Sequence, residues 1–227
     1  MRIFLKIGLA WITLAVGGQA QDLNETAIKQ LVYDAILENP DIVVEAMQLV
    51  RERQRLEMIA EAGTIENAPV IGDPDAPITI VEFFDYNCGW CKNAAGVMRQ
   101  AVADNPDVKI VLREYPILRQ SSLVAARAAL AARKQDKYED FHWALMDLRN
   151  VTEDTILETA ENLGIDTDQL LLDMESERVE NHLLDTRTIT EGLDISATPA
   201  FIVGDRVLPG YISAEQLVAL LDAERAK

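Results

Sequence analysis

The sequence predicts an α/β protein, and three observations support that prediction. An apolar, β-branched and aromatic run at 78–84 is typical of a buried strand. Directly after it, Cys88-Gly89-Trp90-Cys91 opens an expected helix that continues to about Ala103. The remaining elements alternate in type: a strand at 108–113, helices to about Gly192, and strands at 200–203 and 206–208.

Capping and helix-breaking residues indicate where the later helices and strands begin and end. Helices are expected at about 123–134, 137–149, 152–163, 168–174 and 178–192. The last two strands are separated by Gly204-Asp205 alone, which predicts an antiparallel hairpin. Ser213 and Gln216 have the spacing of a capping box, so a final helix begins there.

The first twenty residues are typical of a secretory signal peptide. Arg2 and Lys6 precede a short apolar stretch, and small residues lead to a cleavage site after Ala20. The alternative is an uncleaved anchor, but the apolar stretch is about half of the ~20 residues that a membrane span needs. We therefore expect a periplasmic protein that is not inserted in the membrane once residues 1–20 are removed. That compartment is oxidising.

The amino-acid composition limits the kinds of molecule that this protein is expected to bind. The chain has 38 acidic and 21 basic residues, and its formal net charge is −17. Such acidity argues against nucleic acid and against anionic membrane surfaces, and the simplest explanation is a well-solvated surface. Cys88 and Cys91 are the only two cysteines, so the sequence contains no disulfide framework.

Residues 21–62 are expected to form a helical oligomerisation region. Asn24 can cap a helix whose apolar positions recur at helical spacing, and a second helix is expected to end near Gly63. One interpretation is that these helices pack on the core of their own chain. Self-association through residues 23–62 is favoured, because a two-helix arm cannot bury such a face alone.

A linker is expected at 63–77. This stretch contains two glycines and three prolines and shows little periodicity. A short edge strand near Val70-Ile71 is compatible with that composition.

The Cys88-x-x-Cys91 spacing predicts redox chemistry. Two cysteines three residues apart at a helix start lie on one face, close enough to form a disulfide. The helix N-terminus favours the thiolate of Cys88, so Cys88 is the expected attacking sulfur and Cys91 the resolving thiol. The alternatives are a structural disulfide and half of a zinc site. Zinc normally needs four ligands, and His142 and His182 have no matching spacing, so no metal is expected.

The sequence resembles the DsbA family of thioredoxin-fold oxidoreductases. The similarity is carried by the run from Glu82 to Cys91 and by Ala197-Thr198-Pro199-Ala200-Phe201. The N-terminal helices resemble the oligomeric branch typified by suppressor-of-copper-sensitivity protein C and the Com1-like proteins. This resemblance implies a thioredoxin domain at 78–227, with a helical insertion at about 119–192.

Glu82 is an acidic residue in an otherwise apolar strand. A solvent-facing position would explain it, and so would a buried carboxylate with a raised pKa that takes the proton of Cys91. The family resemblance favours the second interpretation, since Glu82 matches the position of such an acid.

Thr198, Pro199 and Trp90 are the expected substrate-binding residues. On its own, Pro199 reads as an ordinary proline at the start of a strand. The resemblance implies a cis-proline that faces the sulfurs and leaves the Thr198 backbone free to pair with a substrate strand. Trp90 is either an aromatic wall for the substrate or a packing residue, and the Gly89-Trp90 pair is close to the Gly-Tyr of isomerases.

The resulting prediction is an exported thiol–disulfide oxidoreductase that needs no cofactor. It would act on cysteine-containing exported proteins, most simply as a disulfide isomerase or reductase regenerated by a membrane reductase. One alternative is a dithiol oxidase recharged by a quinone-linked membrane partner. An alternative of another class is a copper(I)-binding protein, because two soft thiolates can hold copper(I).

Overall fold

The computed structural model describes residues 24–227, so the predicted signal peptide at 1–20 lies outside the described residues. The chain divides into two compact units, one ending at Leu49 and the other running from Val50 to Lys227. In chain order the described elements are α1 (Glu25–Glu38), α2 (Asp41–Ala62), β1 (Val70–Gly72), β2 (Ile78–Phe84), α3 (Gly89–Asp104), β3 (Val108–Glu114), α4 (Gln120–Ala132), the 3₁₀ turn η1 (Arg133–Gln135), α5 (Tyr138–Asp147), α6 (Glu153–Asn162), α7 (Thr167–Asp173), α8 (Glu177–Gly192), β4 (Ala200–Val203), β5 (Arg206–Pro209) and α9 (Ala214–Arg225).

The second unit is built on a five-stranded mixed sheet in the order β1-β3-β2-β4-β5. β2 pairs with β3 in parallel over its whole length, and with β4 antiparallel. The expected hairpin of β4 and β5 is confirmed, as is the short edge strand β1, which pairs antiparallel with β3. Parallel neighbours need a crossover, and α3 provides it between β2 and β3.

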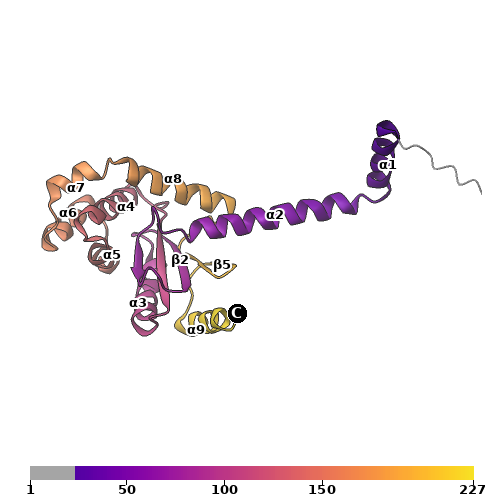
Figure 1. Ribbon diagram of the computed structural model, residues 1–227. Helices are drawn as coiled ribbons and strands as arrows, with labels where there is room; N and C mark the ends of the chain where they lie inside the picture. The colour runs from indigo at the N-terminus through magenta and orange to yellow at the C-terminus, as the bar shows by residue number, and fades with distance from the viewer. Residues whose placement is uncertain (1–23) are drawn as a thin grey trace, which may run out of the picture. The chain divides into compact units, whose positions relative to one another are not determined.

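The two faces of the sheet have different coverings. Side chains alternate along β2, so Ile80 and Phe84 join a core with α3, α9 and the insertion, while Val81 and Phe83 join a second core with α8 and Ala62. α3 and α9 lie on one side of the sheet, and α8 lies on the other (Figure 1).

The helical insertion lies between β3 and β4. Helices α4 to α8 match the expected segments to within a few residues. The side chains of Thr152 and Asp166 cap α6 and α7. α5 packs on α3, which connects the insertion to the helix that carries the two cysteines. The structure thus confirms an α/β thioredoxin fold with a helical insertion.

The first unit leaves its apolar side chains exposed. Asn24 caps α1 as predicted, through its Oδ1 and the N–H of Ala27. No residue of α1 is buried, and the apolar residues of its stripe are all exposed: Ile28, Leu31, Val32, Tyr33, Ile36 and Leu37. Residues of the early turns of α2 are exposed in the same way: Ile42, Val43, Val44, Met47 and Leu49. Contiguous exposed apolar surface of this kind marks an interaction site.

Arg113 of β3 holds the last turn of α2 against the sheet. Its side chain is fully buried, and its guanidinium donates hydrogen bonds to the carbonyl oxygens of Ala62 (2.9 Å), Glu61 (2.8 Å) and Thr64 (3.1 Å). These carbonyls lie at the C-terminal end of α2, where the helix dipole favours a cation. The hydrogen-bond donors of this buried guanidinium are therefore satisfied by backbone carbonyl groups rather than by a carboxylate.

We expect Arg113→Met to destabilise the second unit by about 2–4 kcal/mol, because it leaves buried carbonyl groups without donors. Urea unfolding measures the loss. Arg53→Met is the matched control: Arg53 is exposed and makes only a 3.9 Å contact with Glu57, so a change within about 0.5 kcal/mol is expected. Equal effects of the two substitutions would contradict the anchoring role.

Candidate active site

The strand β2 delivers the dithiol to the start of α3. Asp85 ends the strand, and its carboxylate accepts hydrogen bonds from the N–H groups of Asn87 (2.7 Å) and Leu118 (2.9 Å). Cys88 then occupies the N-cap position of α3, and its Sγ accepts the N–H of Cys91 at 3.4 Å. Both cysteines are free thiols; Cys91 is fully buried, whereas Cys88 keeps a small exposed area.

The two sulfurs have opposite electrostatic environments. The hydrogen bond from the Cys91 thiol is the main cause that lowers the pKa of Cys88 to about 5, and the Thr198 side chain and the N–H groups of Cys91 and Trp90 add to it. Burial raises the pKa of Cys91 far above its ordinary range. Cys88 is therefore a thiolate at neutral pH while Cys91 keeps its proton, as an attacking and a resolving thiol require.

Glu82 is buried on the face of the sheet that carries α3. The carboxyl is 1 % exposed, and its Oε1 has no hydrogen-bond partner. Strand alternation puts Glu82 on the same side as Ile80 and Phe84, whose core includes Cys91. Burial, with a smaller contribution from the Cys88 charge, raises the pKa of Glu82 to about 8. The solvent-facing interpretation of Glu82 is wrong.

The Thr198–Pro199 peptide bond is cis, and its loop lies against Cys88. The Thr198 carbonyl oxygen lies 3.3 Å from the Cys88 sulfur and accepts a hydrogen bond from it when Cys88 is protonated. Two predicted site residues far apart in the sequence, Cys88 and Thr198, are thus in contact.

Trp90 lies at the surface beside a tyrosine that the sequence analysis did not identify. Trp90 is 61 % exposed, so it is not a core-packing residue. Its ring lies 5.6 Å from the ring of Tyr211. The predicted hairpin could have indicated that Tyr211 lies near the site. Ala200 pairs with Pro209, so the residues after Pro209 return to Pro199. The Pro199 carbonyl accepts a hydrogen bond from the N–H of Gly210.

The two histidines form hydrogen bonds with groups other than the sulfurs. His142 contacts the Tyr86 hydroxyl through Nδ1, and His182 accepts the N–H of Glu114 through Nε2. Among residues 24–227, no three His, Cys, Asp or Glu side chains are grouped as metal ligands.

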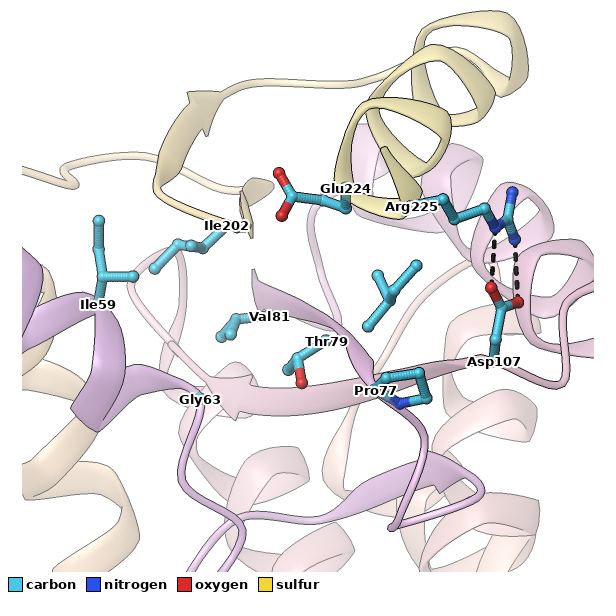
Figure 2. Close-up of a pocket in the computed structure, with 11 residues that line it drawn as sticks. Ile59, Gly63, Pro77, Thr79, Val81, Asp107, Ile202, Glu224 and Arg225 are labelled. Carbon is cyan, nitrogen blue, oxygen red and sulfur yellow. Dashed lines mark hydrogen bonds and ion pairs between the residues drawn. The ribbon is translucent and has the colours of Figure 1, made fainter. Parts of the chain in front are cut away.

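The cavity in Figure 2 is separate from this site. It has a volume of about 540 Å³ and is lined by apolar residues such as Ile59 and Val81, with an Asp107–Arg225 ion pair at one end. Its lining includes none of the candidate site residues Glu82, Cys88, Cys91, Thr198 and Pro199.

We expect alkylation of reduced Cys88 by iodoacetamide to reach half of its maximal rate near pH 5 instead of near the ordinary thiol value of 9.0. The thiolate is the reacting form, so the rate rises as pH increases through the pKa. Cys91→Ala removes the main hydrogen bond and should shift the half-point upward. A wild-type half-point near 9 would contradict the assignment of Cys88 as the attacking thiolate.

Two domain families match parts of the chain. Residues 79–222 match the model of the DSBA-like thioredoxin domain, and residues 25–57 match that of the copper resistance protein ScsC N-terminal domain. A thioredoxin-like oxidoreductase from Silicibacter pomeroyi is 42 % identical with a TM-score of 0.72, covering 74 % of this chain and 97 % of its own. ScsC of Proteus mirabilis in a transitional conformation is 26 % identical with a TM-score of 0.70, covering 89 % and 97 %.

One relative is named as an ion antiporter. The Na(+)/H(+) antiporter NhaA 1 of Mycobacterium sp. (strain KMS) is 30 % identical over 166 residues, which are 70 % of this chain but 27 % of that protein. The chain therefore spans about a quarter of the length of this relative. Within the described residues, no helix has the length and apolar character that a membrane span requires. The domain match covers more than half of the chain, and the chain belongs to the family of DSBA-like thioredoxin domains.

Proposed function

We propose that this oxidoreductase is a periplasmic disulfide isomerase or reductase that acts on exported proteins. The observation that carries the proposal is the pairing of a stabilised thiolate at Cys88 with a buried, protonated thiol at Cys91. The Cys88 thiolate can attack a disulfide at neutral pH, and the Cys91 thiol stays protonated until a mixed disulfide has formed.

The first step is attack of the Cys88 thiolate on a substrate disulfide. An S–S bond forms between Cys88 and one substrate sulfur, and the other substrate sulfur leaves as a thiolate. Thr198 holds the substrate. Among residues 24–227, no backbone group pairs with its N–H or carbonyl, so an extended segment can add there as a strand. Trp90 and Tyr211 offer exposed aromatic rings at the same side of the site.

Two routes lead on from the mixed disulfide. In isomerisation, another substrate thiolate attacks the substrate sulfur, and Cys88 leaves as a thiolate with no net redox change. In reduction, Cys91 attacks the Cys88 sulfur, the substrate leaves reduced by two electrons, and a Cys88–Cys91 disulfide remains. Cys91 must lose its proton first, and the Glu82 carboxylate is the acceptor that this buried site offers.

Glu82→Gln should slow the second route by about 10- to 100-fold, because an amide cannot take the proton. A mixed disulfide between Cys88 and a chromogenic aromatic thiol reports the release rate. With wild type the rate should rise as pH increases through about 8, where the Glu82 carboxylate forms, and the variant should lack this rise. Exposed Glu158→Gln is the control. Identical pH profiles for Glu82→Gln and wild type would exclude the proton-acceptor role.

The exposed apolar stripe of α1 and early α2 supports an oligomer. The apolar residues of the stripe on α1 are all exposed, and the same region matches the ScsC N-terminal domain. An oligomer places several dithiols on one assembly, which suits repeated attack on a misfolded substrate. The dithiol would be regenerated by a membrane reductase; an oxidase recharged by a quinone-linked partner is the alternative.

The oligomer and the isomerase activity are tested together. We expect the mature chain to be oligomeric by light scattering and to restore a scrambled disulfide-bonded protein. A chain that starts at Val50 should be monomeric and only oxidise, and the doubly substituted Leu31→Asp, Leu49→Asp chain should behave alike, since both residues lie on the exposed stripe. A monomeric wild type that only oxidises would favour the dithiol oxidase.

A copper(I)-binding protein is the second candidate. Residues 25–57 match a domain that is named for a copper resistance protein, and Cys88 and Cys91 are soft ligands within one helical turn. Tight binding of one copper(I) together with no thiol–disulfide exchange would favour this function over the first.

A further inference from the structure

The turn that precedes Cys88 is bound along its length by residues that follow β3. Asp85 accepts the N–H of Leu118 through Oδ2 at 2.9 Å. Asn87 donates from Nδ2 to the hydroxyls of Ser121 and Ser122, both at 3.1 Å. The side chain between them, Tyr86, points into the core and is 1 % exposed.

Tyr86 is the centre of a buried polar network. Its hydroxyl donates to Glu114 Oε1 at 2.9 Å and lies 3.0 Å from His142 Nδ1. Tyr138 of α5 donates to the same Glu114 oxygen, also at 2.9 Å. The Tyr86 ring packs edge-on against Phe84 and His142, with centroids at 5.3 and 5.6 Å. Two hydrogen bonds and two aromatic contacts therefore fix this ring.

The chemistry described above does not use this network, yet Tyr86 lies two residues before the attacking sulfur. The low pKa of Cys88 depends on short contacts with its neighbours, among them the N–H of Cys91, which lies 3.4 Å from the sulfur. Such contacts are lost when the backbone that carries the sulfur shifts by a fraction of an ångström. A rigid turn is thus needed to keep the sulfur in place.

We infer that Tyr86 is a positioning residue for the Cys88 thiolate, and that Glu114 of β3 and His142 of α5 hold it in place. The helical insertion then serves the reaction directly: through α5 it fixes the turn from which the nucleophile projects. This inference rests on the proposed function only in taking Cys88 as the attacking sulfur.

Tyr138 provides a matched control. Tyr86 and Tyr138 are both buried tyrosines that donate to Glu114 Oε1 at the same distance, so Tyr86→Phe and Tyr138→Phe each remove one such bond. Tyr86 alone belongs to the turn before Cys88. A purely structural role predicts equal consequences for the two variants, and a positioning role predicts different ones.

The experiment is the pH dependence of Cys88 alkylation in the full mature chain, with thermal unfolding recorded in parallel. Tyr86→Phe should raise the pKa of Cys88 by about half a unit or more, which lowers the alkylation rate about threefold at pH values below the pKa. Tyr138→Phe should lower the unfolding temperature without moving that pKa. If Tyr86→Phe does not fold, His142→Phe is measured instead, since it removes a partner of Tyr86 and keeps a ring; a shift in the same direction is expected.

An unchanged Cys88 pKa in Tyr86→Phe overturns the inference, and so does an equal shift in Tyr138→Phe. If the wild type itself shows an ordinary thiol pKa, the proposed function fails instead. The two failures are therefore distinguishable by the wild-type curve alone.

Discussion

The parallel pairing of β2 with β3 is the interaction on which the rest of the site depends. Residues 78–84 run in full register beside 108–114, and this register places Glu82 and Glu114 on the face that carries α3. It also aligns the ends of the two strands. Tyr86, just beyond the end of β2, can therefore donate a hydrogen bond to Glu114 at the end of β3. Because side chains alternate, a slip of one residue would move Glu82 to the face covered by α8 and separate it from the sulfurs.

Much of this architecture could be predicted from local sequence. Apolar runs identified the strands, and the spacing of Cys88 and Cys91 identified the dithiol. The contact between Cys88 and Thr198 was accessible only through a family resemblance, since no local pattern relates residues 110 positions apart. Tyr86 and His142 could not be recognised in the same way, because their partners are brought together by the docking of α5 on α3. Separate strand and helix patterns carry no information about that docking.

The buried and half-buried positively charged side chains share one kind of partner. In a chain with 38 acidic residues, several buried or half-buried cations bind backbone carbonyl groups rather than carboxylates. Arg113 binds the end of α2, Arg133 binds Asn67 and Ala68, and Lys92 binds the end of α5. Acidic side chains remain mostly at the surface, where water solvates them. Four acidic side chains of the described residues are buried: Glu82, Asp85, Glu114 and Asp173. Burial raises the pKa of Glu82 and Glu114, which lie on the face of the sheet that carries α3.

The carbonyl groups bound by Arg113 show that the structural boundary between the N-terminal arm and the sheet differs from the boundary expected from the sequence. Residues 61–64 belong by sequence to the arm and its linker, but by contact they belong to the sheet. A chain that began after Thr64 would lack the three carbonyl groups that Arg113 binds, and its guanidinium would be buried without these partners. The sheet therefore depends on the last turn of α2, and the compact unit that contains the sheet begins at Val50, within that continuous helix.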